Sequence, residues 1–116
     1  MLIRMTQLDY DREVAFIATV DSNGEEIEIG VARYFTNPDG QTAEFALVIA
    51  DEWQRRGLGT RLMTCLIDAA REKGFKALQG EVLATNTKMI SLMKRLEFIT
   101  RIKTDDQTLY IVIKLL

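Results

Sequence analysis

The sequence predicts an α/β domain in which one mixed, mostly antiparallel sheet of about six strands carries two main helices. Three observations lead to this fold class. The first 50 residues hold three apolar segments separated by short turns, which is typical of an antiparallel meander. Residues 59–73 change to the three- and four-residue spacing of an amphipathic helix, and further strands and a second helix follow. With 116 residues, the chain is long enough for a single domain over 1–116 and too short for two.

The antiparallel part of the sheet is predicted from its turns. The segments DSNG at 21–24 and NPDG at 37–40 place glycine and proline where tight turns need them. The three strands that these turns connect are expected at 14–20, 27–35 and 42–50. Ahead of the first strand, Thr6 is expected to cap a short helical turn over 7–11.

The second half of the chain alternates helices with strands. Gly74 follows the helix at 59–73 at the position of a left-handed C-cap, and Asn86 begins a second helix. The apolar side of the first helix is Leu62, Met63, Leu66, Ile67 and Ala70, and that of the second is Met89, Ile90, Leu92, Met93 and Leu96. Strands are predicted at 77–83, 98–103 and 108–115. The strand–helix–strand unit over 44–83 should form a right-handed parallel crossover.

Composition excludes several classes of function. There are 15 basic and 17 acidic residues, so the net charge of -2 gives no electrostatic basis for binding nucleic acid. No apolar run approaches the roughly 20 residues of a membrane span, and no export signal is apparent. Cys65 is the single cysteine, which fits a reducing cytoplasm. The chain has no histidine, so histidine-based triads are excluded and no metal site is expected.

The segment QRRGLGTRLM at 54–63 places two glycines and several donors at the start of a helix. Backbone N–H groups in the first turn of a helix lack internal partners and carry the positive end of the helix dipole. Glycine lets an anionic group come close to them, which favours a phosphate or pyrophosphate site. The segment matches neither a Walker A loop nor the dinucleotide motif GxGxxG. A tight strand-to-helix connection with solvated arginines is the alternative interpretation.

Two motifs resemble those of the GNAT N-acetyltransferase superfamily. QRRGLG at 54–59 matches its Gln/Arg-x-x-Gly-x-Gly/Ala signature and lies between a strand and a helix, as that family requires. The stretch 86–98 resembles the second signature, an asparagine-led helix that ends in Gly-Phe, with Glu97 in place of the glycine. The resemblance runs from about Met5 to the last strand and therefore implies a GNAT-type sheet for nearly the whole chain.

Within the superfamily, the chain is similar to the acetyltransferase domain of bacterial Pat-type protein-lysine acetyltransferases. The resemblance is carried by TQLDYDREVAFIA, GVARYFTNPDGQTAEFALVIADEWQRRGLG and GEVLATNTKMISLMKRLEF. Such domains usually begin with an extra strand and one or two helices, for which this sequence has no room, so a shortened domain is expected. An open sheet edge invites pairing with another chain, so a homodimer is a further expectation that light scattering can test.

The resemblance implies acetyl-CoA as co-substrate, lying across the splayed end of the strand at 42–50. The backbone of Leu47, Val48 and Ile49 would then bind the pantetheine arm and polarise the thioester carbonyl. The pyrophosphate would be held, mostly by backbone amides, at Arg55, Arg56, Gly57, Leu58, Gly59 and Thr60. Asn86 would contact the cofactor beyond the thioester. Lys94 and Arg95 either form a solvated helix face or meet the 3′-phosphate.

A general base is needed because a lysine amine is mostly protonated near neutral pH. Without histidine, a carboxylate is the natural candidate, and Glu44 interrupts the apolar strand shortly before the expected cofactor site. Pat-type enzymes carry their catalytic glutamate in this AEFA context; the alternative is that Glu44 only faces water. Glu81 is a second candidate, with a structural role favoured. The tyrosine that many small-molecule members use as general acid aligns with Met93, so that acid is missing here.

The sequence therefore predicts direct transfer of acetyl from acetyl-CoA to the ε-amine of a protein lysine in a ternary complex. By resemblance, acyl-CoA synthetases are expected acceptors, and neither nucleic acid nor membrane is an expected partner. Two alternatives stay open. One is a small-molecule amine acetyltransferase with the same cofactor site. The other is a non-catalytic module that senses acetyl-CoA.

Overall fold

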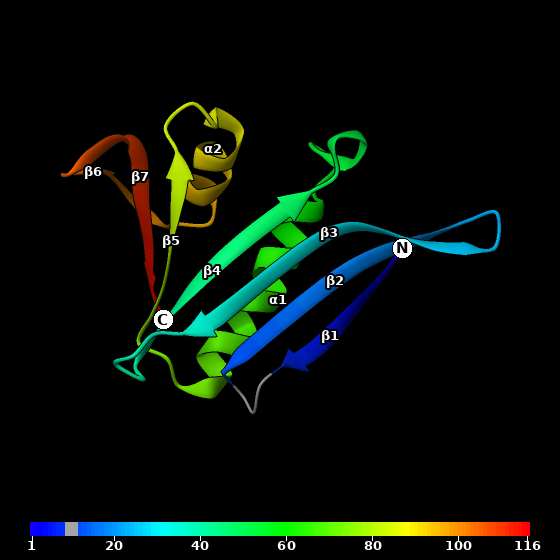
Figure 1. Ribbon diagram of the computed structural model, residues 1–116, viewed down its shortest axis with the longest axis horizontal. Helices are drawn as coiled ribbons and strands as arrows, with labels where there is room; N and C mark the ends of the chain where they lie inside the picture. Colours follow the sequence, from blue (N-terminus) through cyan, green and yellow to red (C-terminus); the bar gives the residue numbers. More distant parts are fainter. Residues whose placement is uncertain (9–11) are drawn as a thin grey trace.

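The computed structural model describes residues 1–8 and 12–116, which form one sheet with two helices packed on it (Figure 1). The strands are β1 (Leu2–Leu8), β2 (Glu13–Ser22), β3 (Glu25–Thr36), β4 (Thr42–Ile49), β5 (Ala77–Leu83), β6 (Ile99–Lys103) and β7 (Asp106–Leu115). The helices are α1 (Leu58–Lys73) and α2 (Thr87–Arg95), and a 3-10 turn, η1 (Asp51–Trp53), precedes α1. This arrangement confirms the predicted fold class, and the shared elements begin and end within two residues of the predicted positions.

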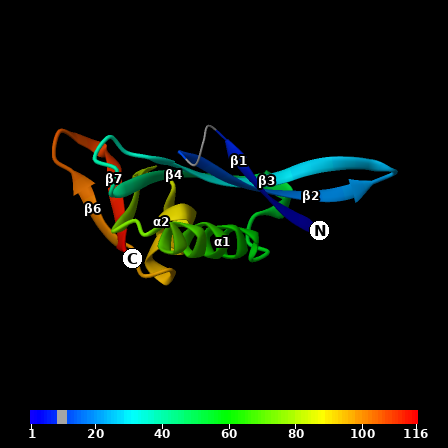
Figure 2. The same cartoon turned by 90° about the horizontal axis from the view of Figure 1, so that it is seen from below.

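The strand order across the sheet is β1-β2-β3-β4-β5-β7-β6. The pair β4–β5 is parallel and the other pairs are antiparallel. Both helices lie on the same side of the sheet (Figure 2). The predicted parallel connection through α1 is therefore present, and the opposite face of the sheet carries no helix within the described residues.

The helical turn predicted after Thr6 is wrong. The structure has β1 in its place, paired antiparallel with β2 from Leu2↔Thr19 to Leu8↔Glu13, and this strand raises the number in the sheet to seven. An isolated turn of helix is costly to nucleate, whereas the edge of β2 offers a full ladder of backbone partners. The remainder of the predicted turn, residues 9–11, lies outside the described residues.

The core lies between the sheet and α1. The predicted apolar side of α1 is buried, with Leu62, Met63 and Leu66 fully shielded from solvent. Tyr34 on β3 and Phe45 on β4 belong to the same buried cluster. Since side chains alternate along a strand, the neighbours of Phe45 on β4 project from the helix-free face.

The two central strands separate partway along β4. The parallel ladder joins only Thr42, Ala43 and Glu44 of β4 to Ala77, Leu78 and Gln79 of β5, after which β5 continues with β7. The ring of Phe45 packs over Gly80, where an added Cβ would lie 2.7 Å from the ring. Beyond Glu44, the sheet therefore opens into a fork between β4 and β5.

Asp39 fixes the turn between β3 and β4. Its Oδ1 accepts hydrogen bonds from the backbone N–H groups of Gln41 at 2.8 Å and Thr42 at 2.9 Å. These bonds hold the pKa of the Asp39 carboxyl below its ordinary value of 3.8. A lowered pKa in the folded state stabilises the protein above the unfolded-state value, and that stability is lost as pH falls through the folded-state pKa.

Asp39→Ala is accordingly expected to lower the melting temperature near neutral pH, and the difference from wild type should shrink as pH falls below 3.8. Thermal unfolding followed by circular dichroism across this range measures both effects. The matched control is Asp21→Ala, an exposed acid in the other predicted turn. A loss for Asp39→Ala that stays constant down to strongly acidic pH would contradict this assignment.

Candidate functional site

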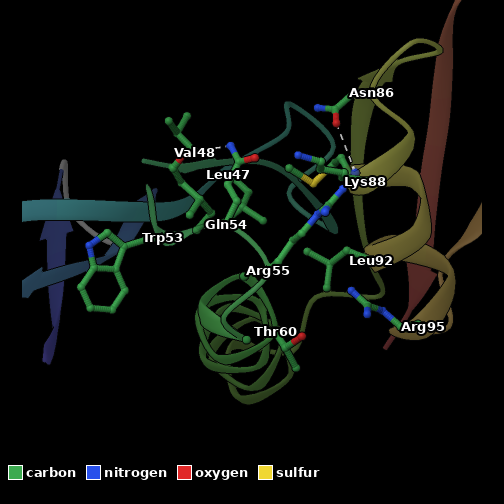
Figure 3. A pocket seen from close by; sticks show the side chains of 14 residues that line it. Leu47, Val48, Trp53, Gln54, Arg55, Thr60, Asn86, Lys88, Leu92 and Arg95 are labelled. Carbon is green, nitrogen blue, oxygen red and sulfur yellow. Dashed lines mark hydrogen bonds between the residues drawn. The ribbon is translucent and has the colours of Figure 1, made fainter. Parts of the chain in front are cut away.

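A cleft of about 300 Å³ lies where β4 ends, between the first turn of α1 and the side of α2 (Figure 3). Its walls include eight of the residues predicted for cofactor binding: Leu47, Val48, Ile49, Arg55, Gly57, Gly59, Thr60 and Asn86. The cleft therefore brings together three segments of the sequence: the end of β4, the turn into α1, and α2 with its cap.

The backbone of β4 presents polar groups to this cleft. The N–H of Ala50 donates to the carbonyl of Ile29 on β3 at 2.9 Å. This bond shows which residues of β4, taken every second one, direct their backbone groups toward β3. By the alternation of an antiparallel ladder, Val48 also bonds to β3, whereas the N–H and C=O groups of Leu47 and Ile49 point into the fork. The side-chain Nε2 of Gln54 donates to the carbonyl of Ile49 at 3.3 Å, consistent with that direction. Val48 also lines the cleft, although its side chain lies on the helix-free face and is exposed.

The glycine turn leads directly into α1. Gly57 has φ of 80°, a left-handed conformation that favours glycine, and it precedes the first helical residue. The first backbone bond of the helix runs from Arg61 N–H to the carbonyl of Gly57 at 3.1 Å. The N–H groups of Leu58, Gly59 and Thr60 therefore have no partner within the helix, and the first turn contains no acidic residue. This geometry fits an anionic group.

Two residues of the predicted phosphate site do not direct their side chains into the cleft. The Arg56 guanidinium lies 4.9 Å from the centre of the Trp53 ring, and its side chain does not line the cleft. The side chain of Leu58 is buried in the core, so this residue can offer only its backbone N–H. Arg55 takes a left-handed φ of 66° and its side chain extends into the cleft (Figure 3).

Asn86 caps α2, as its position in the sequence predicts. Its Oδ1 accepts a hydrogen bond from the N–H of Met89 at 3.2 Å, which satisfies one of the free donors at the helix start (Figure 3). Because the oxygen is used by the cap, the amide nitrogen is the group that remains for a ligand in the cleft.

The backbone geometry at the end of α2 explains why the second signature has glycine at the position of Glu97. Phe98 N–H donates to the carbonyl of Met93, and Glu97 N–H donates to that of Lys94, the pair of bonds that forms a Schellman motif. Glu97 consequently adopts a left-handed φ of 66°. At the end of α1, Gly74 occupies the equivalent position with φ of 89°. The backbone of Glu97 is therefore strained in a conformation that glycine would adopt without steric cost.

Glu97→Gly is expected to raise the free energy of unfolding by about 1 kcal/mol, because relief of the left-handed strain exceeds the extra unfolded-state entropy of glycine. Urea denaturation measures this gain. Glu97→Ala removes the same charge but keeps a Cβ, so it should give no comparable gain. Equal stabilisation by both substitutions would show that charge, not backbone strain, is responsible.

Glu44 occupies the last parallel pair before the fork, opposite Gln79 on β5. It is half-buried, lies on the helix-free face of the sheet and does not line the cleft. The second candidate, Glu81, accepts a hydrogen bond from Lys103 Nζ at 3.1 Å. This partner raises the pKa of Lys103. Glu81 therefore has a structural partner of its own.

Met93 and Tyr34 are core residues. Met93, at the position of the family's tyrosine acid, is fully buried. The ring of Tyr34 packs edge-on against Phe75 with 5.4 Å between ring centroids.

Two polar residues in the cleft wall, Gln54 and Lys88, were not among the predicted site residues, and a third, Arg95, was named only as an alternative to a solvated helix face. Gln54 holds the turn by donating to Ile49 and to Asp51 Oδ1 at 3.3 Å each. Lys88 and Arg95 lie on the cleft side of α2. Their spacing of seven residues, two turns of helix, was the available signal for that shared face.

Comparison with known proteins finds relatives that cover most of this chain. The model of the acetyltransferase (GNAT) family matches residues 2–98. An acetyltransferase of Pseudomonas aeruginosa is 36% identical over 108 residues, covering 93% of this chain and 58% of that protein. The acetyltransferase Pat of Mycolicibacterium smegmatis is 31% identical over 97 residues, covering 83% of this chain and 28% of that protein. The crystal structure of the GNAT domain of S. lividans PAT superposes with a TM-score of 0.80 at 26% identity, covering 96% of this chain and 65% of that one.

The chain thus spans about three-fifths or less of the two curated relatives. Within the described residues, neither helix is long and apolar enough to cross a membrane. The same residues contain no group of three or more acidic or cysteine side chains placed to hold a metal ion.

Proposed function

We propose, since the chain belongs to the acetyltransferase (GNAT) family, that it transfers acetyl from acetyl-CoA to the ε-amine of a lysine in a protein. Acetyl-CoA is the co-substrate of this family. The observation that carries the proposal is the fork in the sheet. The parallel ladder ends at Glu44, and Leu47, three residues further along the same strand, lines the cleft.

The cleft supplies the cofactor half of the reaction. The free N–H groups of Leu58, Gly59 and Thr60 would bind the pyrophosphate, and Gly57 leaves room for its approach. The pantetheine arm would run along the exposed edge of β4, where the backbone of Leu47 and Ile49 offers hydrogen bonds of the kind a sheet neighbour makes. Asn86 would donate its amide hydrogens from the opposite wall.

The helix-free face would supply the acceptor half. A lysine amine that reaches the fork from this face meets Glu44, which takes a proton as general base directly or through water. The neutral amine then attacks the thioester carbonyl carbon. The Leu47 N–H stabilises the developing oxyanion, and the C–S bond breaks to release the CoA thiolate. The products are an acetylated lysine and CoA, with no covalent enzyme intermediate.

The acceptor class rests on likeness to Pat. The relatives include the acetyltransferase Pat and the GNAT domain of a PAT protein, and the Glu44 context matches the AEFA strand of that type. Acyl-CoA synthetases in a reducing cytoplasm are therefore the acceptors we propose. The helix-free face suits a protein better than a small amine, because it holds exposed apolar side chains on β4 and β5 such as Val48 and Leu83.

An acceptor panel tests this function. Acetyl-CoA is supplied with a folded acyl-CoA synthetase, with the same synthetase after its lysines have been methylated, and with free polyamines. We expect acetyl-lysine, detected by mass spectrometry, only on the unmodified synthetase. Acetylation of polyamines alone would favour a small-molecule acetyltransferase. Acetyl-CoA binding without transfer to any acceptor would indicate a sensing module.

A further inference from the structure

We propose that α2 provides a second, cationic wall of the phosphate site, in which Lys88 and Arg95 bind phosphoryl groups of the CoA nucleotide. This inference rests on the proposed function and adds two residues that the sequence motifs do not include. Of the two residues for which the sequence leaves open a solvated helix face or the 3′-phosphate, Lys94 and Arg95, only Arg95 lines the cleft.

Helix geometry places the two cations on one face. Lys88, Leu92 and Arg95 are spaced by four and three residues, so they form a single stripe along α2. All three line the cleft, whereas Lys94 lies off this stripe. Figure 3 shows Lys88 near Asn86 at one end of α2 and Arg95 level with Thr60 at the other.

The close contact between the helices brings this stripe within reach of a ligand. Leu92 is buried, and a Cβ added at Gly59 would lie 3.0 Å from its Cδ2. Gly59 therefore allows α2 to pack directly on the first turn of α1. The absence of a side chain at this position sets the width of the cleft, with free N–H groups on one wall and the α2 cations on the other.

The charges around the cleft favour a polyanion. Arg55, Lys88 and Arg95 all line it, and within the described part of the chain no carboxylate does. None of these three cations forms an ion pair among the described residues. Like charges that converge without a counterion repel one another, and an anion placed between them removes that repulsion. The helix dipole favours cations in the last turn of α2. It favours Lys94 and Arg95 alike, so it does not explain why Arg95 lines the cleft and Lys94 does not.

The nucleotide half of CoA has the matching chemistry. It carries a diphosphate and a 3′-phosphate, more anionic groups than one helix terminus can satisfy. The α2 cations would therefore select acetyl-CoA over acetyl-pantetheine, which has the same thioester and arm but no phosphate. They would also make affinity depend on salt, because charge-assisted contacts at a partly exposed site are screened.

The test is calorimetric titration of Lys88→Gln, Arg95→Gln and the double variant with acetyl-CoA, 3′-dephospho-acetyl-CoA and acetyl-pantetheine. Each single substitution should weaken acetyl-CoA binding about 3- to 10-fold, and the double variant by about the product. Acetyl-pantetheine affinity should not change. Lys94→Gln is the matched control on the same helix and should behave as wild type. Lys88→Arg and Arg95→Lys should retain most of the affinity, which separates charge from folding.

The outcomes distinguish the two proposals. If wild type binds acetyl-CoA and the Lys88 and Arg95 variants match Lys94→Gln, the cationic wall is wrong and the acetyltransferase proposal stands. Equal losses for acetyl-CoA and acetyl-pantetheine would also overturn it, because phosphate would not be the group recognised. No binding of acetyl-CoA by wild type would overturn both proposals together.

Discussion

Glu44→Gln is expected to lower the rate of acetyl transfer by about 10²- to 10⁴-fold, the usual contribution of a positioned general base. Glutamine preserves the size of the side chain and can still form hydrogen bonds, but it cannot accept the proton that leaves the lysine amine. Glu44 lies at the mouth of the fork on the face from which the acceptor would enter. Because it does not line the cofactor cleft, acetyl-CoA affinity should be unchanged. Steady-state kinetics and titration of the same preparation measure the two quantities.

Glu81→Gln is the matched control for this substitution. Glu81 projects from the same face of β5 and is paired with Lys103, so its loss should affect stability more than turnover. Full activity of Glu44→Gln would contradict the assignment of Glu44 as base. A large loss of activity in Glu81→Gln with little change in Glu44→Gln would transfer the role to Glu81.

Gly57→Glu is expected to abolish measurable acetyl-CoA binding. The substitution places a carboxylate at the free N–H groups of the first turn of α1, where it competes with the pyrophosphate and repels it. It also imposes a Cβ on a residue with φ of 80°, although no atom lies within 4 Å of that position. The stability loss from the backbone should be about 1–2 kcal/mol, which leaves the fold available for the binding measurement.

Gly24→Glu separates these two effects. Gly24 has φ of 82°, open space around it, and a location in the turn between β2 and β3, far along the sequence from the cleft. It should show a similar loss of stability by thermal unfolding and unchanged affinity for acetyl-CoA. If Gly57→Glu binds acetyl-CoA as well as Gly24→Glu does, the turn at 54–59 is not the phosphate site.

Most of the fold could be predicted because its signals are local. The helix at 59–73 and the turns at 21–24 and 37–40 depend on periodicity and on glycine and proline within a few residues. The strand β1 could not be predicted in this way. Its residues Leu2–Leu8 become a strand by pairing with β2, and the capping signal of Thr6 is weaker than that ladder.

The candidate site shows a similar division. Backbone donors such as Gly59 and the cap at Asn86 follow from motif position, because a helix start fixes where N–H groups point. The directions of Arg55 and Arg56 do not follow, since they depend on a left-handed φ at one residue and on Trp53 beside the other. The cationic face of α2 requires knowledge of which helix packs against the first turn of α1.

The most direct test of the account is a ¹⁵N–¹H correlation spectrum of the protein titrated with acetyl-CoA. If acetyl-CoA binds in the fork, the largest shifts should occur at the backbone amides of Leu47, Ile49 and residues 57–60 and at the side-chain amide of Asn86. The amides of the turn at 21–24 should not move. An unchanged spectrum at saturating acetyl-CoA, or shifts confined to residues away from the cleft, would contradict the proposal that this fork is a cofactor site.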